Sequence, residues 1–229
     1  LIFNDFSDIL WRIGFPILSK IQTSRKQVSK FFLKMLNTGL LFGFPITIGL
    51  YFVADELVYI FLGNEWIAIS EIIKVFSLFG FISFVAAPYN ILTQSMGFPK
   101  LLTYASSISL LFLISSLVYL SYFSLNLLYI AYAVILSDII YLLFTISISF
   151  TFIKINYINN INIFFGIFIS NLSLAFVLNT IDPLIRSFSD VESLFIKIIT
   201  GVIVYVATFL FSKKLLSIKF EKLLVFYDQ

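Results

Sequence analysis

The sequence predicts an all-α membrane protein, a polytopic transmembrane helix bundle. Of its 229 residues, 60% are hydrophobic and only 12% are charged, and the mean hydropathy is +1.05. A hydrocarbon core about 30 Å thick needs roughly 20 apolar residues of helix to cross it. The alternating, roughly 10-residue segments of an outer-membrane barrel are absent. Six long apolar stretches follow a partial one at 1–18; they lie at 36–62, 72–97, 101–123, 125–150, 161–181 and 193–212.

Two residue types are missing, and their absence excludes whole classes of chemistry. The chain has no cysteine and no histidine, so it has no disulfide framework and lacks the commonest general base and metal ligand. The sequence also contains no phosphate-binding glycine loop, metal-ligand spacing or nucleophile constellation. We therefore expect no enzyme activity, no cofactor, no metal site and no nucleic-acid partner.

The partial first stretch, 1–18, carries charges inside an apolar run. Asp5, Asp8 and Arg12 fall at i, i+3 and i+7 on one helical face, and Asp8 and Arg12 are spaced to pair. A charge at mid-membrane costs at least ~2.5–3.5 kcal/mol, so this face should look into a water-filled cavity or onto helices outside this chain. Arg12 then either contacts an anionic substrate, which suits its planar guanidinium, or forms a neutral pair that only fixes packing.

The next segment, 20–35, is basic. Val28, Phe31 and Phe32 fall at helical spacing, and the lysines lie largely on the other face. This pattern predicts an amphipathic helix on the cytoplasmic membrane surface, attracted to anionic lipids. The alternative is a solvated basic linker.

Stretches 36–62 and 72–97 contain helix breakers. Gly39 and Gly43 have the spacing that lets two helices approach closely. Pro45 and Pro88 each remove a helix hydrogen bond, and we expect them to act as hinges, although static kinks would look the same.

Polar residues in the later stretches are few. Asn90 and Gln94, one turn apart beside Pro88, are expected to line the same cavity as Arg12. Asp138 has no basic residue in its own helix, so it needs a partner on another span, a proton or water; ion or proton coupling is one interpretation and a buried structural Asp the other. Lys197 and Trp66 are interpreted as interfacial, a snorkelling cation and an aromatic anchor.

The charges in the connections alternate in sign. Basic residues follow the first stretch and end the chain, and acidic residues gather between 55 and 71 and between 182 and 192. Since cytoplasmic loops collect Lys and Arg, we expect a multi-pass protein of the cytoplasmic (inner) membrane with its C-terminus in the cytoplasm. The chain also opens on Leu1 in mid-pattern, which we interpret as a C-terminal fragment of a longer protein.

A resemblance to a known family emerges from several short motifs taken in order. The sequence resembles the polysaccharide exporter or O-antigen flippase family, within the multidrug/oligosaccharidyl-lipid/polysaccharide flippase superfamily, over about residues 11–110. The motifs are Pro-x-x-Ser, a Phe-Pro helix leading to Ala-Asp, a Gly-x-x-Trp turn and a Gly-x-Pro loop. Here they are Pro16 and Ser19, Phe44 and Pro45 with Ala54 and Asp55, Gly63 and Trp66, and Gly97 and Pro99.

The resemblance implies a fold like that of the MATE transporters, with two six-helix lobes around a central cavity. Residues 1–154 would form an incomplete C-terminal lobe that includes the amphipathic helix 20–35. Residues 155–229 would add two extra helices and a basic tail, so the spans would correspond to helices 8 to 14. The N-terminal lobe would be a missing partner, and Asp5, Asp8 and Arg12 would face the cavity.

The function implied is flipping of a polyprenyl-diphosphate-linked oligosaccharide, such as an O-antigen or lipopolysaccharide unit, by alternating access. Besides this substrate, the expected partners are membrane lipids. One alternative is a drug or metabolite exporter of the same fold. Another is a membrane glycan polymerase or ligase, although the longest outer connections have only about 10 residues, short for such an enzyme. A further alternative is a non-transporting half-protein.

Overall fold

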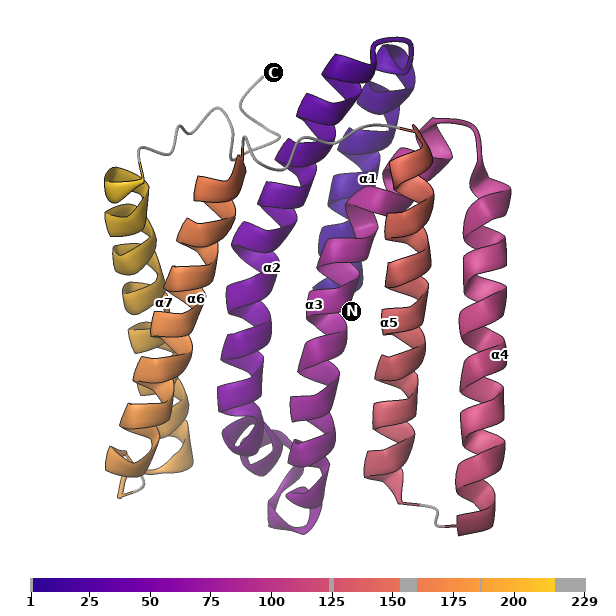
Figure 1. Cartoon of the computed structure of the whole chain (residues 1–229). Helices are drawn as coiled ribbons and strands as arrows, with labels where there is room; N and C mark the ends of the chain where they lie inside the picture. Colours follow the sequence, from indigo (N-terminus) through magenta and orange to yellow (C-terminus); the bar gives the residue numbers. More distant parts are fainter. Residues whose placement is uncertain (1, 124–125, 153–159, 186, 217–229) are drawn as a thin grey trace.

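The computed structural model describes residues 2–123, 126–152, 160–185 and 187–216, with side chains from Ser7 onward. In this part of the chain all regular structure is helical (Figure 1). The α-helices are α1 (Ile2–Ile21), α2 (Arg25–Leu62), α3 (Ala68–Ser95), α4 (Pro99–Phe123), α5 (Leu127–Phe152), α6 (Ile161–Ile181) and α7 (Asp190–Leu215), with short 3-10 turns η1 (Asn64–Trp66) and η3 (Asp182–Leu184).

Within these described ranges, six helices, α2 to α7, are long and apolar enough to cross a membrane. They correspond one to one to the six apolar stretches of the sequence, so the predicted fold class is confirmed. Large apolar side chains are also exposed on their surfaces, among them Phe123 at 72% and Phe176 at 69%. Side chains of this kind are stable on a surface that hydrocarbon covers.

The helices form a broad bundle around α2 and α3, which pack against each other along their length (Figure 1). On one side α3 contacts α5, and α4 packs on α5. On the other side the antiparallel pair α6 and α7 packs on α2. The first helix, α1, contacts both α3 and α2. The central pair therefore carries the contacts to all other parts of the molecule.

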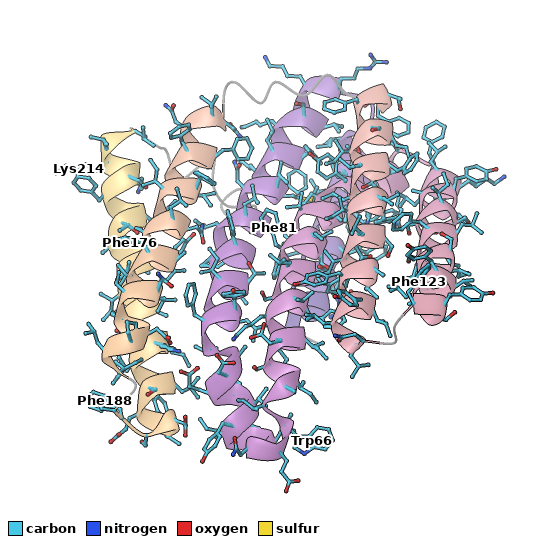
Figure 2. All side chains as sticks on the ribbon, turned by 60° about the horizontal axis from the view of Figure 1, so that its bottom comes forward. Trp66, Phe81, Phe123, Phe176, Phe188 and Lys214 are labelled. Atoms are coloured by element: carbon cyan, nitrogen blue, oxygen red, sulfur yellow. The ribbon has the colours of Figure 1, made fainter. Side chains whose placement is uncertain are left out.

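The two ends of the bundle carry opposite charges. Figure 2 shows Lys214 at one end and Trp66 and Phe188 at the other. The basic end is formed by the start of α2, the start of α4 and the end of α7, with Arg25, Lys26, Lys100, Lys213 and Lys214. The opposite end holds Asp55, Glu56, Glu65, Glu71, Asp182, Asp190 and Glu192.

The segment 20–35 differs from the prediction, because no separate helix corresponds to it. It comprises the end of α1, a turn and the beginning of α2, a single helix of 38 residues and about 57 Å at 1.5 Å per residue. The apolar face expected to lie on lipid is buried instead: Val28, Phe32 and Met35 belong to one cluster with Leu18 of α1 and Ile91 of α3. The amphipathic spacing is present, but the surface that covers the apolar face is protein.

Close contact between α2 and α3 depends on Gly39 and Gly43, as their spacing predicted. A Cβ atom on Gly39 would lie 2.9 Å from the backbone carbonyl oxygen of Phe84, and one on Gly43 would overlap the Phe84 ring. Only a residue without a side chain allows this approach, so the two glycines set the distance between the two central helices.

Substitution of Gly39 tests this packing against Gly49, a helical glycine with open space around its Cβ position. We expect Gly39→Ala to destabilise the protein by about 1–3 kcal/mol through overpacking. Gly49→Ala should stabilise it by about 0.5–1 kcal/mol, because alanine is the better helix former. Thermal unfolding of the purified protein in detergent measures both. Two changes of the same sign would contradict the packing described here.

Candidate functional site

The polar face of α1 is the first candidate site. Leu10, Gly14 and Leu18 face the protein and are buried against α2 and α3. Asp8 and Arg12 lie exposed on α1, as the helical spacing predicted. The side chain of Asp5 lies outside the described residues. Among the described side chains no ion pair joins Asp8 to Arg12, so the neutral pair that the spacing suggested is not formed.

Asn90 and Gln94, the other predicted cavity residues, lie on α3 and are both partly buried. The Tyr141 hydroxyl of α5 donates a hydrogen bond of 2.9 Å to the side-chain oxygen of Asn90. The side chain of Asn90 thus takes part in the contact between α3 and α5. This long-range partner had no signal in the sequence, because a tyrosine in an apolar span is ordinary.

Asp138 lies on α5 one helical turn before Tyr141, on the same face of the helix. It is partly buried, and its Oδ2 atom is buried with no hydrogen-bond partner among the described residues. A carboxyl oxygen in this situation is costly unless the group is protonated or binds a cation. Asp138, Tyr141 and Asn90 together form what we call the α3–α5 polar cluster.

Both prolines lie inside uninterrupted helices, Pro45 in α2 and Pro88 in α3. A proline has no N–H, so it leaves the carbonyl four residues earlier without its usual donor. For Pro45 this carbonyl belongs to Leu41, and the Tyr205 hydroxyl of α7 donates to it at 2.7 Å. For Pro88 it belongs to Phe84, whose carbonyl oxygen is the one that approaches Gly39.

Lys197 is the residue that sequence reasoning placed wrongly. It does not snorkel to an interface, because it is only 2% exposed. Its Nζ atom lies 2.5 Å from Glu56 of α2 and 2.6 Å from Asp182 of η3, and it donates a 2.9 Å hydrogen bond to the Phe52 carbonyl. The sequence shows a charged residue inside each of two apolar stretches, Glu56 and Lys197, but it does not show that the two are partners.

A second ion-pair group lies nearby but is more open. Lys74 of α3 pairs with Asp55 of α2 at 2.9 Å and with Glu71 at 3.1 Å. The two carboxylate side chains are 50% and 64% exposed. Solvent screening therefore weakens these pairs relative to those of Lys197.

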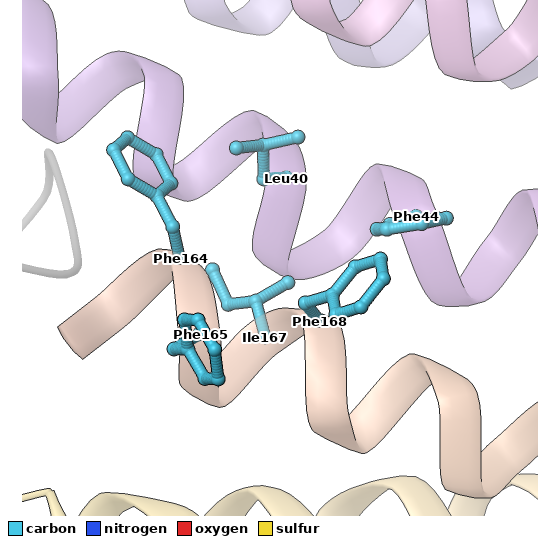
Figure 3. Close-up of a pocket in the computed structure, with 6 residues that line it drawn as sticks. All are labelled: Leu40, Phe44, Phe164, Phe165, Ile167 and Phe168. Carbon is cyan, nitrogen blue, oxygen red and sulfur yellow. The ribbon is translucent and has the colours of Figure 1, made fainter. Parts of the chain in front are cut away.

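Two hollows lie between helices of the described part. One, of about 300 Å³, lies between α2 and α6 (Figure 3) and is lined by apolar residues, namely Leu40, Phe44, Phe164, Phe165, Ile167 and Phe168. The other, of about 720 Å³, lies at the acidic end and is lined by Ala68, Ile69, Glu71, Ile72, Asn126, Leu127 and Leu128. Neither is lined by Asp8, Arg12, Asn90 or Gln94, whose place in a substrate cavity stays a prediction.

A comparison with known proteins finds a family match at the start of the chain. Residues 1–71, which hold α1 and α2, match the polysaccharide biosynthesis protein family. Over these residues the chain is similar to that family. This agrees with the resemblance found in the motifs, and the chain is a multi-pass membrane protein.

Two curated relatives match the chain over a longer stretch than the family does. An uncharacterized membrane protein in the cps region of Klebsiella pneumoniae is 30% identical over 92 residues, which are 40% of this chain and 19% of that protein. The teichuronic acid biosynthesis protein TuaB of Bacillus subtilis (strain 168) is 28% identical over 99 residues, 43% of this chain and 20% of TuaB. The match thus spans about a fifth of the length of these relatives. No solved structure matches the chain.

Removing the Lys197 charge tests the buried ion pairs. We expect Lys197→Met to destabilise the protein by about 3–5 kcal/mol, because it leaves the Glu56 carboxylate buried and unpaired. Lys74→Met is the matched control and should cost about 1 kcal/mol or less. Thermal unfolding in detergent compares them.

Adding Glu56→Gln to Lys197→Met gives a second check, because it removes the charge that the first change left unpaired. The double variant should be more stable than Lys197→Met alone. Equal losses of stability for Lys197→Met and Lys74→Met would show that burial of the Lys197 ion pairs does not affect the free energy of unfolding.

Proposed function

We propose that this chain is the C-terminal part of a flippase that moves a polyprenyl-diphosphate-linked oligosaccharide across the cytoplasmic membrane by alternating access. The observation that carries the proposal is the exposed polar face of α1, with Asp8 and Arg12, inside the segment that matches the polysaccharide biosynthesis family. Charges of this kind are stable in a membrane only beside water or other protein. An N-terminal lobe facing α1 would supply both.

In this proposal Arg12 contacts the diphosphate or an anionic sugar of the substrate. Its guanidinium offers a planar set of donors that matches phosphate oxygens, and no described carboxylate pairs with it. Asp5, Asn90 and Gln94 would line the same cavity. No bond is made or broken in transport, which agrees with the proposal that the protein is not an enzyme.

The ends of the bundle support an orientation in the membrane. The basic end would lie in the cytoplasm, which puts the C-terminus inside and the acidic end outside. Labelling single cysteines at positions 26 and 65, in a chain without other cysteines, would distinguish the two orientations. In this arrangement residues 1–154 form the incomplete lobe, and 155–229 add α6, α7 and a cytoplasmic tail.

The same fold would also serve a drug or metabolite exporter, and the match to polysaccharide proteins favours the flippase. A polymerase or ligase is disfavoured because the described connection 63–67 on the acidic side is short. O-antigen or another surface polysaccharide would be the class of product.

Substitution of Arg12 in the complete protein tests the function. We expect Arg12→Ala to lower export about 10- to 100-fold, the effect of losing a charge-assisted contact of about 1.5–3 kcal/mol. The readout is surface polysaccharide together with accumulation of the lipid-linked unit inside the cell, at equal protein abundance. Lys30→Ala, a change outside the proposed cavity near the start of α2, is the control. If export is equal in the two variants and only drug resistance falls, the exporter alternative replaces the flippase.

Asp138 is proposed as the group that couples transport to a proton or cation. We expect Asp138→Asn to remove the dependence of export on the membrane ion gradient, because the amide cannot ionise. Export into inverted vesicles with and without a gradient measures this, with the exposed Glu65→Gln as the control. Gradient dependence that survives in Asp138→Asn would assign Asp138 a purely structural role.

A further inference from the structure

Polar contacts from α7 reach α2 on both sides of Pro45. Toward the basic end, the Tyr205 hydroxyl donates to the Leu41 carbonyl at 2.7 Å. Toward the acidic end, Lys197 donates to the Phe52 carbonyl at 2.9 Å and pairs with Glu56. Two helices of a membrane bundle can pack without polar contacts of this kind. The position of these contacts on either side of Pro45 therefore needs a physical reason.

The Tyr205 contact replaces the hydrogen bond that Pro45 removes. Pro45 lacks the N–H that would bond to the Leu41 carbonyl. In hydrocarbon an unsatisfied backbone carbonyl is strongly unfavourable, and side chains of neighbouring helices satisfy freed groups of this kind. The Tyr205 hydroxyl is that side chain, and 164 residues of sequence separate it from Leu41.

The Lys197 contact ties three elements together. The ammonium group of α7 lies between Glu56 of α2 and Asp182 of η3, the turn that follows α6. Lys197 is 2% exposed and Glu56 is 9% exposed, so neither charge has water to replace its partner. Separating α7 from α2 would leave the Glu56 carboxylate unpaired in an apolar surrounding, while Lys197 would keep only Asp182.

Apolar packing joins the same elements beside the Tyr205 contact. Leu41 of α2, Ile163 and Ile167 of α6 and Phe209 of α7 form one buried cluster, and Tyr205 packs against it. On the α6–α7 side, Gly201 lets α7 approach Leu174 of α6, because a Cβ there would lie 3.3 Å from that side chain. The pair therefore meets α2 as a single packed unit.

We propose that α6 and α7 are a brace that holds α2 on both sides of Pro45, with Tyr205 and Lys197 as its two anchors. The brace makes α2, α6 and α7 move as one body during any conformational change. The brace restricts how these helices move relative to one another, and this restriction does not depend on which substrate is carried. Tyr205 and Lys197 are positioning residues in this role.

A double-mutant cycle between Pro45 and Tyr205 tests the first anchor. In the full chain in detergent, Tyr205→Phe should lower the melting temperature by about 2–4 °C, the shift expected for one lost hydrogen bond in a chain of this size. In a Pro45→Ala background the same change should have little effect, because an alanine at this position supplies its own N–H to the Leu41 carbonyl. Tyr132→Phe, on an exposed tyrosine of α5, is the control. Equal shifts in the two backgrounds, or a Tyr205→Phe shift no larger than the control, would overturn the proposal.

A distance measurement tests whether the brace fixes the shape of α2, and it does not need the Pro45→Ala variant to fold. The chain has no cysteine, so spin labels at Lys30→Cys and Tyr59→Cys report the distance between the two ends of α2. Double electron–electron resonance should give a narrow distribution that broadens in Tyr205→Phe and stays narrow in Tyr132→Phe. A distribution that is unchanged in Tyr205→Phe would show that α2 keeps its shape without the brace.

Discussion

A hydrocarbon layer offers no water, so a buried polar group is costly unless it finds a partner inside the protein. This constraint explains contacts that packing alone does not require. Pro45 leaves the Leu41 carbonyl without a donor, and Tyr205 supplies one at 2.7 Å. Glu56 carries a charge into an apolar helix, and the buried Lys197 neutralises it. The position of α7 against α2 follows from these two requirements.

The same constraint acts differently at the contact between α2 and α3. Pro88 leaves the Phe84 carbonyl without its helical donor, and that carbonyl approaches the backbone of α2 at Gly39. Glycine permits this approach because it has no side chain. The two central helices thus each carry a proline, and each turns the affected carbonyl toward a neighbouring helix.

Local properties of the chain were predictable from the sequence, and long-range partners were not. The six spans follow from length and apolarity, and the exposure of Asp8 and Arg12 follows from helical spacing. The amphipathic face of segment 20–35 was also predictable, but spacing does not tell whether lipid or protein covers it. The roles of Lys197 and Asn90 depend on Glu56 and Tyr141, partners from distant helices that no pattern within one stretch identifies.

Because the brace holds α2 at Pro45, Pro88 of α3 is the better placed of the two prolines to act as a hinge. At Pro45 a directional hydrogen bond and a buried ion pair hold α2 to α7, so bending there would break both. At Pro88 the Phe84 carbonyl approaches the backbone of α2 at Gly39, and neither anchor of the brace bonds to α3. Asn90 follows Pro88 by two residues and binds Tyr141, one turn from Asp138. A bend of α3 at Pro88 would therefore move the α3–α5 polar cluster. Because Asp138 belongs to this cluster, its protonation or ion occupancy would then depend on the shape of α3.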